Sequence, residues 1–178
     1  MKLVIASDLH GSSAMAKKLV EIKEREQADK LIMLGDIFNH GPRNPFPEKY
    51  SPMEVADILN SIKEDLIVVK GNCDSQVDTL ISEFDFIEDL CLMIGSKSLL
   101  LTHGHVYNKD KMPKTKFDAV IYGHFHTGFI ETQDGVIVAN AGSIALPKGG
   151  TPSSYITIDG DKMTLKDIDG KEIKSVVL

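Results

Sequence analysis

Short apolar runs alternate with amphipathic segments along the first half of the chain. Buried strands are predicted at 3–6, 31–34 and 66–70. Between these runs, apolar residues recur at helical spacing over 12–28 and 53–64, and Ser12 or Ser13 is placed to cap the first helix. This β-α-β-α-β order predicts a parallel sheet with right-handed crossovers.

The second half of the chain is richer in predicted strands. They span Phe86–Ile94, Ser98–Thr102, Ala119–Tyr122, Gly128–Thr132, Val136–Asn140, Tyr155–Ile158, Met163–Ile168 and Ile173–Val177. Asp-Gly pairs beginning at 134, 159 and 169 are typical of tight hairpin turns. A parallel half joined to an antiparallel half predicts two packed sheets with helices outside. Since no linker or repeat interrupts the pattern, residues 1–178 are predicted to form a single domain.

Composition narrows the classes of partner. The 178 residues carry a formal net charge of -6, and only Arg25 and Arg43 among the 20 basic residues are arginines. A broad basic face is therefore not expected, which disfavours a long nucleic acid as ligand. An anionic substrate would need positive charge that is concentrated locally.

The two cysteines, Cys73 and Cys91, and the N-terminus bear on the compartment. Two cysteines without paired C-x-x-C spacing form neither a disulfide framework nor a zinc ribbon, which favours a reducing cytosol. Cys91 alternates with Leu90 and Leu92 and is predicted to be structural. Only four apolar residues follow Lys2, too few for a signal peptide or a membrane span. We therefore predict a cytoplasmic protein.

Polar side chains that commonly bind metals follow five of the apolar runs. They are Asp8, His10, Asp36, Asn72, His103, His124 and His126. In open α/β sheets, functional groups gather beyond the carboxyl ends of the strands, so these side chains should meet if the five strands are neighbours. Each short motif by itself is weak evidence of a metal site. Five such motifs in order, each placed after a strand, are strong evidence of one.

The residue types indicate the kind of metal site. Four imidazoles, two carboxylates and one amide suit Mn²⁺, Fe, Zn²⁺ or Ni²⁺ better than Ca²⁺. Seven protein ligands are too many for one catalytic ion with an open position, but they suit two ions that share a carboxylate. Such pairs clamp the attacking and leaving oxygens in displacements at phosphorus.

The motifs SDLHG, LGDIFNHG, KGNCD, THGH, YGHFH and AGSIALPKGG together resemble those of the calcineurin-like metallophosphoesterases. In its length and in the residues of its motifs, the chain most resembles the small bacterial YfcE-type phosphodiesterases. The resemblance implies an α/β fold, a β-sandwich of two mixed sheets flanked by helices. It also implies a metal-dependent phosphoric diester hydrolase that acts on small or activated substrates.

The resemblance also implies roles for the seven residues. Asp8, His10 and His126 would hold one ion, and Asn72, His103 and His124 would hold the other. Asp36 would bridge the ions, and a hydroxide on or between them would be the nucleophile. Two divalent ions are expected, with Mn²⁺ favoured over Ni²⁺, Zn²⁺, Fe²⁺ or Mg²⁺.

Cys73 departs from the family pattern, in which a histidine often follows the asparagine. A thiol is a poorer hydrogen-bond donor than an imidazole, and its ordinary pKa of about 8.5 suits it less to general-acid work. One hypothesis is that the enzyme handles leaving groups that need little protonation, such as aryl or other activated phosphodiesters. The YfcE-type subgroup shares this cysteine, so the resemblance implies diesterase activity. The alternative is that Cys73 only fills space. Asp74 would either orient the group that occupies the pocket or only cap the helix that follows.

Further candidates lie near these motifs. Asn39 and His40 in the proline-rich loop 37–52, together with His105, are candidate substrate contacts. Arg43 in the same loop is placed either to clamp a phosphate oxygen or to remain solvated. His105 would replace His103 as ligand, support it, or do neither, and His103 is preferred because it lies nearer the strand end. Lys148 is predicted to be exposed.

Some functions other than the phosphodiesterase remain open, while others are excluded. A phosphomonoesterase would use the same fold, and a non-catalytic scaffold would resemble the retromer subunit that uses this fold with a degraded site. A nuclease of the superfamily would carry a basic groove. No G-x-x-x-x-G-K-[ST] or G-x-G-x-x-G motif follows a strand, which excludes a nucleotide switch and a dehydrogenase. A homo-oligomer is compatible with the sequence.

Overall fold

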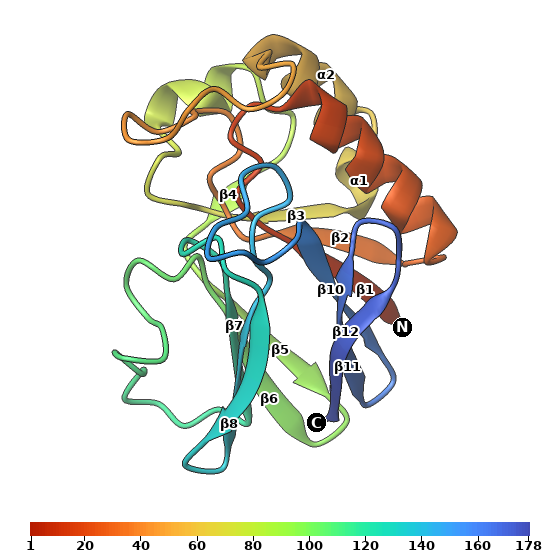
Figure 1. Ribbon diagram of the computed structural model, residues 1–178, viewed down its shortest axis with the longest axis vertical. Helices are drawn as coiled ribbons and strands as arrows, with labels where there is room; N and C mark the ends of the chain where they lie inside the picture. Colours follow the sequence, from red (N-terminus) through yellow and green to blue (C-terminus); the bar gives the residue numbers. More distant parts are fainter.

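The computed structural model describes residues 1–178 as two mixed β-sheets with two helices on one side (Figure 1). The seven-stranded sheet has the order β12-β11-β10-β1-β2-β3-β4, and the five-stranded sheet has the order β5-β6-β7-β9-β8. The elements are β1 Lys2–Ala6, α1 Ser13–Arg25, β2 Lys30–Met33, α2 Pro52–Asn60, β3 Leu66–Val69, β4 Phe86–Ile87, β5 Leu90–Ile94, β6 Lys97–Leu101, β7 Ala119–Tyr122, β8 Phe129–Gln133, β9 Val136–Asn140, β10 Ser154–Asp159, β11 Lys162–Asp167 and β12 Glu172–Val177.

The parallel βαβαβ unit predicted for the first half is confirmed. Strands β1, β2 and β3 pair in parallel. Helix α1 begins after Ser12, whose hydroxyl accepts a hydrogen bond from the Met15 backbone N–H at 3.3 Å. Helix α2 begins at Pro52, whose missing N–H costs nothing in the first turn. A short 3-10 helix, Lys63–Asp65, follows α2 after a turn and covers the last two residues of the predicted segment.

The predicted division into a parallel and an antiparallel half is wrong in detail. Strand β10 pairs antiparallel with β1, so β10, β11 and β12 extend the first sheet from its other side. The second sheet also contains parallel pairs, β6 with β7 and β7 with β9. Alternation along a strand tells which face is buried but not which strand lies beside it, so the pattern could not place these strands.

The single strand predicted over Phe86–Ile94 is two strands in different sheets. Strand β4 pairs with β3, whereas β5 pairs with β6 at the edge of the other sheet. The chain crosses between the sheets at Glu88 and Asp89, and the Glu88 side chain is 83% exposed. Two adjacent charged residues, Glu88 and Asp89, interrupt the apolar run at this corner, and the prediction joined the apolar segments on either side of them into one strand.

Apolar side chains form three layers around the sheets. One cluster lies between the sheets and includes Ile5, Ile32, Leu101 and Ile121. A second joins α1 and α2 to the outer face of the seven-stranded sheet (Figure 1). On the outer face of the five-stranded sheet, loop side chains such as Tyr107 and Met112 cover Val120 and its neighbours. The helices therefore flank one sheet only. No helix of the structure combines the length and apolarity that crossing a membrane requires.

Candidate metal centre

Five strand ends bring the seven predicted ligands to one edge of the sandwich. From the sequence, these side chains were expected to meet if the five strands were neighbours. The strands instead belong to two sheets: β1, β2 and β3 to one, and β6 and β7 to the other. Glycines let these ends approach closely. A Cβ atom at Gly71 would overlap the Asp36 carboxylate, and one at Gly123 would overlap Ser7.

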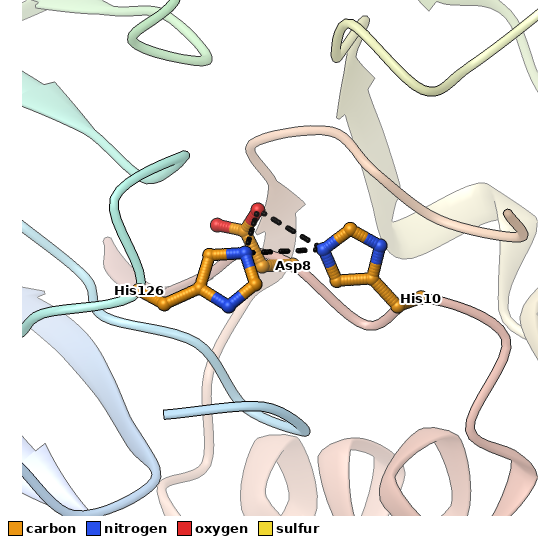
Figure 2. Close-up of side chains that lie close together, drawn as sticks. All are labelled: Asp8, His10 and His126. Carbon is orange, nitrogen blue, oxygen red and sulfur yellow. Dashed lines mark hydrogen bonds and ion pairs between the residues drawn. The ribbon is translucent and has the colours of Figure 1, made fainter. Parts of the chain in front are cut away.

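The first cluster is formed by Asp8, His10 and His126, whose side chains point toward one another (Figure 2). The Asp8 Oδ1 atom lies 3.5 Å from His10 Nε2 and 3.3 Å from His126 Nε2. The two Nε2 atoms are 3.2 Å apart. All three side chains are buried. One carboxylate oxygen and two imidazole nitrogens thus face a common point.

The second cluster is formed by Asn72, His103 and His124. The His103 Nε2 atom lies 3.0 Å from Asn72 Oδ1 and 3.2 Å from His124 Nδ1. The His103 ring is buried, His124 is half-buried and Asn72 is exposed. This cluster therefore opens toward solvent more than the first one does.

Asp36 lies between the two clusters. Its Oδ2 atom is 3.7 Å from His10 Nε2, and its Oδ1 atom is 3.4 Å from His103 Nε2. Each carboxylate oxygen thus faces a different cluster. This is the arrangement that a bridging carboxylate needs.

Backbone carbonyls orient three of the imidazoles. The Nδ1–H groups of His10, His103 and His126 are placed to donate at 2.7, 2.6 and 2.6 Å to the carbonyl oxygens of Asn39, Leu34 and Leu146. When Nδ1 carries the proton, the neutral ring presents a lone pair at Nε2, the atom that faces the cluster. Such outer hydrogen bonds are usual for histidines that bind metals.

One hydrogen-bond acceptor in the first cluster, a carboxylate oxygen of Asp8, has no donor. The buried Asp8 Oδ1 atom has no hydrogen-bond partner. Its other oxygen, Oδ2, accepts a hydrogen bond of 2.8 Å from the His124 backbone N–H. A buried carboxylate oxygen left without a donor is costly, and a cation at this point would satisfy it together with the Nε2 lone pairs. The donor set therefore fits a divalent metal ion.

Backbone strain is concentrated at the same residues. Eight residues other than glycine have a positive φ, and five of them are predicted ligands: Asp8 (58°), His10 (50°), Asp36 (56°), His124 (65°) and His126 (61°). L-residues seldom adopt this conformation, which tends to cluster at functional sites. Here it turns the chain sharply at the strand ends, so that closely spaced side chains enter one site.

Electrostatics keep Asp8 charged. Burial by itself would raise the pKa of the Asp8 carboxyl. The close imidazoles of His10 and His126 favour the ionised form, outweigh burial and hold this pKa well below its usual range. Asp8 therefore offers a carboxylate at neutral pH, the form that binds a cation.

Asp74 holds backbone rather than facing the clusters. Its Oδ2 atom accepts hydrogen bonds from the Asp36 and Gly71 N–H groups at 2.8 and 2.7 Å, and its Oδ1 atom accepts one from Ile37 at 2.8 Å. Burial, with the charge of Asp36 adding, raises the pKa of the Asp74 carboxyl to about 6 despite these bonds. Asp74 thus joins the end of β2 to the end of β3.

Cys73 lies beside the clusters. Its backbone N–H donates to Asp36 Oδ1 at 2.8 Å, and its Sγ atom lies in a group with His10 and Asp36 whose ligand atoms are within 4.8 Å of one another. Burial, together with the charges of Asp36 and Asp74, raises the pKa of the Cys73 thiol to about 12. The thiol therefore stays protonated at neutral pH.

A cleft of about 770 Å³ leads to the clusters. Asn39 and Arg43, predicted as substrate contacts, line it, as does Lys148. The Lys148 ammonium donates to Asn44 Oδ1 at 3.0 Å, which ties the two loops together across the mouth. Arg43 and Lys148 are the only basic residues in the cleft wall, and Asp36 is its only carboxylate.

Two other predicted contacts lie outside this cleft. The His40 ring packs on Phe46 and Tyr50, with centroids 4.4 and 5.5 Å away, so aromatic packing holds it within its own loop. The exposed His105 ring lies 5.4 Å from the His103 ring, centroid to centroid, and does not line the cleft. The predicted substrate-contact roles of His40 and His105 therefore gain no support from the geometry.

Sequence reasoning missed two parts of the site. Phe125, between His124 and His126, lines the cleft with 46% of its surface exposed. Its position between two predicted ligands was the available signal. The carbonyls of Leu34 and Leu146 orient two imidazoles, but every residue has a carbonyl, so no sequence signal marks them.

The family model described as the calcineurin-like phosphoesterase superfamily domain matches residues 1–163. The chain belongs to this superfamily. The resemblance seen in the strand-end motifs is therefore confirmed, and so is the expected sandwich of two mixed sheets flanked by helices.

Among superfamily members, phosphodiesterase YfcE of Escherichia coli (strain K12) is 37% identical over 175 residues, covering 97% of this chain and 95% of the relative. The solved structure of E. coli YfcE, a phosphoesterase, matches with a TM-score of 0.95 at 36% identity, covering 99% of each chain. "Probable metallophosphoesterase YsnB" of Bacillus subtilis is 30% identical over 190 residues, covering 99% of this chain and 96% of the relative.

Proposed function

We propose that this superfamily member is a dinuclear-metal phosphodiesterase. The observation that carries the proposal is the pair of ligand clusters joined by Asp36, which directs one carboxylate oxygen to each. The names of the relatives YfcE and YsnB support a metal-dependent reaction at phosphorus. A scaffold without catalysis would not require buried groups kept in strained conformations at this edge of the sandwich.

The residues fit two ions in the way that the family resemblance implies. Asp8, His10 and His126 would hold the first ion, and Asn72, His103 and His124 the second, with Asp36 shared. When bound, the ions supply Lewis acidity toward the phosphoryl oxygens and lower the pKa of water to about 7. Asp74 acts as a positioning residue, because its carboxylate holds the Asp36 backbone in place.

Local charge explains how an acidic chain can bind an anion. Two divalent ions bring about four positive charges, of which Asp8 and Asp36 cancel about two. Arg43 and Lys148 add positive charge in the cleft wall and would hold the non-bridging oxygens or a second anionic group of the substrate. The net charge of -6 is thus compatible with a small phosphodiester.

Several finer assignments complete the proposal. Mn²⁺ is the favoured ion, because imidazole and carboxylate ligands suit it, with Ni²⁺, Zn²⁺, Fe²⁺ and Mg²⁺ as alternatives. Residues 1–178 act as a single domain in the cytoplasm, and a homo-oligomer is compatible with the proposal. A long nucleic acid is disfavoured as substrate, because no broad basic surface is expected to hold one.

Metal removal tests the proposed function. We expect chelator-treated protein to lose at least about 100-fold in kcat/KM on an aryl phosphodiester, because the ions supply both the nucleophile and the charge stabilisation. Adding Mn²⁺ back should restore the rate. The measurement is release of para-nitrophenol, with the same metal series tested on the aryl phosphomonoester.

The result distinguishes three functions. Restored cleavage of the diester supports the proposal, and restored cleavage of the monoester alone indicates a phosphomonoesterase of the same fold. Hydrolysis of neither ester with any of the five metals would reject the enzyme in favour of a scaffold. Buffer with each metal and no protein controls for metal-catalysed hydrolysis.

Cys73→His tests whether the thiol limits the choice of leaving group. We expect about a 10-fold gain in kcat/KM on an alkyl phosphodiester and little change on an aryl one, because an imidazole can protonate a poor leaving oxygen. Cys73→Ser, which keeps the side chain small, separates this gain from the loss of sulfur. Equal rates for the histidine variant and the wild type on both esters would contradict the hypothesis.

A further inference from the structure

Phe125 occupies an unusual place for an apolar side chain. It lies between His124 and His126, which both have left-handed backbone conformations, with φ of 65° and 61°. The Phe125 N–H donates to the Gly123 carbonyl at 2.7 Å, so the turn is tight. The chain thereby directs both imidazoles into the clusters and leaves the phenyl ring at the cleft mouth, 46% exposed.

The ring is supported on one side and free on the other. It meets the His124 ring edge-on, with centroids 5.0 Å apart and planes at 81°, and the Tyr122 ring in the same manner at 6.1 Å and 74°. Edge-to-face contacts of this kind are favourable and specific in geometry. The neighbouring rings therefore hold Phe125 in one orientation, while nearly half of its surface stays open.

The surroundings of Phe125 indicate what the open surface can take. A substrate phosphate at the clusters would lie close to the Phe125 ring, because Phe125 lines the same cleft as His124 and His126. Arg43 and Lys148 supply positive charge to the same cleft. A ligand complementary to this cleft carries an aromatic ring next to an anionic phosphate. Its ring can pack on Phe125 while its phosphate contacts the basic side chains.

We propose that Phe125 is a specificity-determining residue that packs against an aromatic group on the ester oxygen that stays on the phosphate. This inference rests on the proposed phosphodiesterase function and deepens it by naming a substrate class. The substrates are phosphodiesters whose retained ester group is an aryl ring or a nucleoside. Because the contact lies on the retained group, it acts on substrate selection and not on departure of the leaving group.

Three para-nitrophenyl phosphodiesters test the proposal, because they share a leaving group and differ only in the retained ester: methyl, phenyl or thymidine. We expect the wild-type enzyme with Mn²⁺ to favour a ring-bearing ester over the methyl ester by about 10-fold in kcat/KM, the size of one aromatic stacking contact. Phe125→Ala should lower kcat/KM for the phenyl and thymidine esters by about 10-fold relative to the methyl ester, through KM, so that the preference is lost. The phenyl and thymidine arms separate an aryl ring from a nucleoside.

Two variants control for structural effects. Phe125→Tyr keeps a ring and should retain the preference. Phe46→Ala removes another exposed phenylalanine, which packs on His40 and Tyr50 outside the cleft, and should leave the ratio unchanged. Equal loss on all three esters in Phe125→Ala would overturn the proposal, because the ring would then only brace His124. Absence of a preference in the wild type would also overturn it.

Binding measurements separate this inference from the proposed function. The methyl and phenyl esters of a non-hydrolysable phosphonate, titrated by calorimetry into the metal-loaded protein, should show the same preference of about 10-fold in Kd, abolished in Phe125→Ala. If the wild type cleaves none of the three esters, the proposed function fails. The phosphonate ratio then decides the inference: equal Kd values for the two phosphonates overturn it.

Discussion

Replacing Asp36 with asparagine should reduce phosphodiester hydrolysis by at least about 100-fold and weaken binding of both metal ions together. Even the loss of an outer partner of a metal ligand costs about 10- to 100-fold, and Asp36 directs one oxygen to each cluster. Asparagine has nearly the same shape, but it has no charge and only one oxygen. The variant therefore removes the bridge without opening a cavity.

Metal stoichiometry, measured by mass spectrometry after dialysis, should fall from two ions per chain toward zero, with kcat/KM measured in parallel. Asp57→Asn is the matched control, because Asp57 is exposed on α2, away from the site. The Asp36 oxygen that accepts the Cys73 N–H can be replaced by the amide oxygen, so the fold should survive. Two ions retained with unaltered affinity would refute the bridging role.

Asp74→Ala should produce the largest loss of stability among the site variants. It leaves three buried backbone N–H groups, those of Asp36, Ile37 and Gly71, without an acceptor. At roughly 1–3 kcal/mol for each unsatisfied donor, the free energy of unfolding should fall by about 3–9 kcal/mol. Urea unfolding followed by circular dichroism measures this loss. Metal affinity should fall as well, because Asp36 is no longer held.

Two further variants sharpen this test. Asp78→Ala removes a half-buried carboxylate that accepts the N–H of Ser75, the N-cap of the short 3-10 helix Gln76–Leu80, and should cost only about 1 kcal/mol. A loss for Asp74→Ala as small as that of Asp78→Ala would contradict the positioning role. Asp74→Asn keeps one oxygen and should lie between Asp74→Ala and the wild type.

The raised pKa of Asp74 also predicts a pH dependence in the metal-free protein. A carboxyl group whose pKa is about 6 when folded, above its unfolded value of about 3.9, favours folding when protonated. This contribution is complete below about pH 4 and is lost as pH rises through 6. The wild type should therefore lose stability over this range relative to Asp74→Asn, and parallel curves would show that Asp74 does not titrate there.

The fold was predictable as far as local pattern specifies it. The β1-α1-β2-α2-β3 unit follows from apolar periodicity and from the cap at Ser12, because these signals depend on residues close in sequence. The return of β10 to pair with β1 was not predictable, since register and alternation do not name a partner strand. The corner had a local signal, the adjacent charged residues Glu88 and Asp89, but that signal does not say that the chain changes sheets there.

The site shows the same division. That Asp8, Asp36 and His103 would meet followed from their positions after strands, because the carboxyl ends of such strands gather at one edge. The side-chain surroundings of His40 and Asp74 could not be predicted from the sequence, because they depend on groups from other segments or on backbone atoms. Phe125 had a signal, but only the cleft around it indicates a role.

By itself, the sequence determined the candidate residues for the chemistry: metal-ligand types placed after buried strands, within a family pattern that extends along most of the chain. The tertiary structure decided how they are used. It grouped six of the seven predicted ligands into two clusters on either side of the seventh, Asp36, and it turned Asp74 toward backbone. The physical reason is that strand ends are encoded locally, whereas distances between them depend on how the two sheets pack.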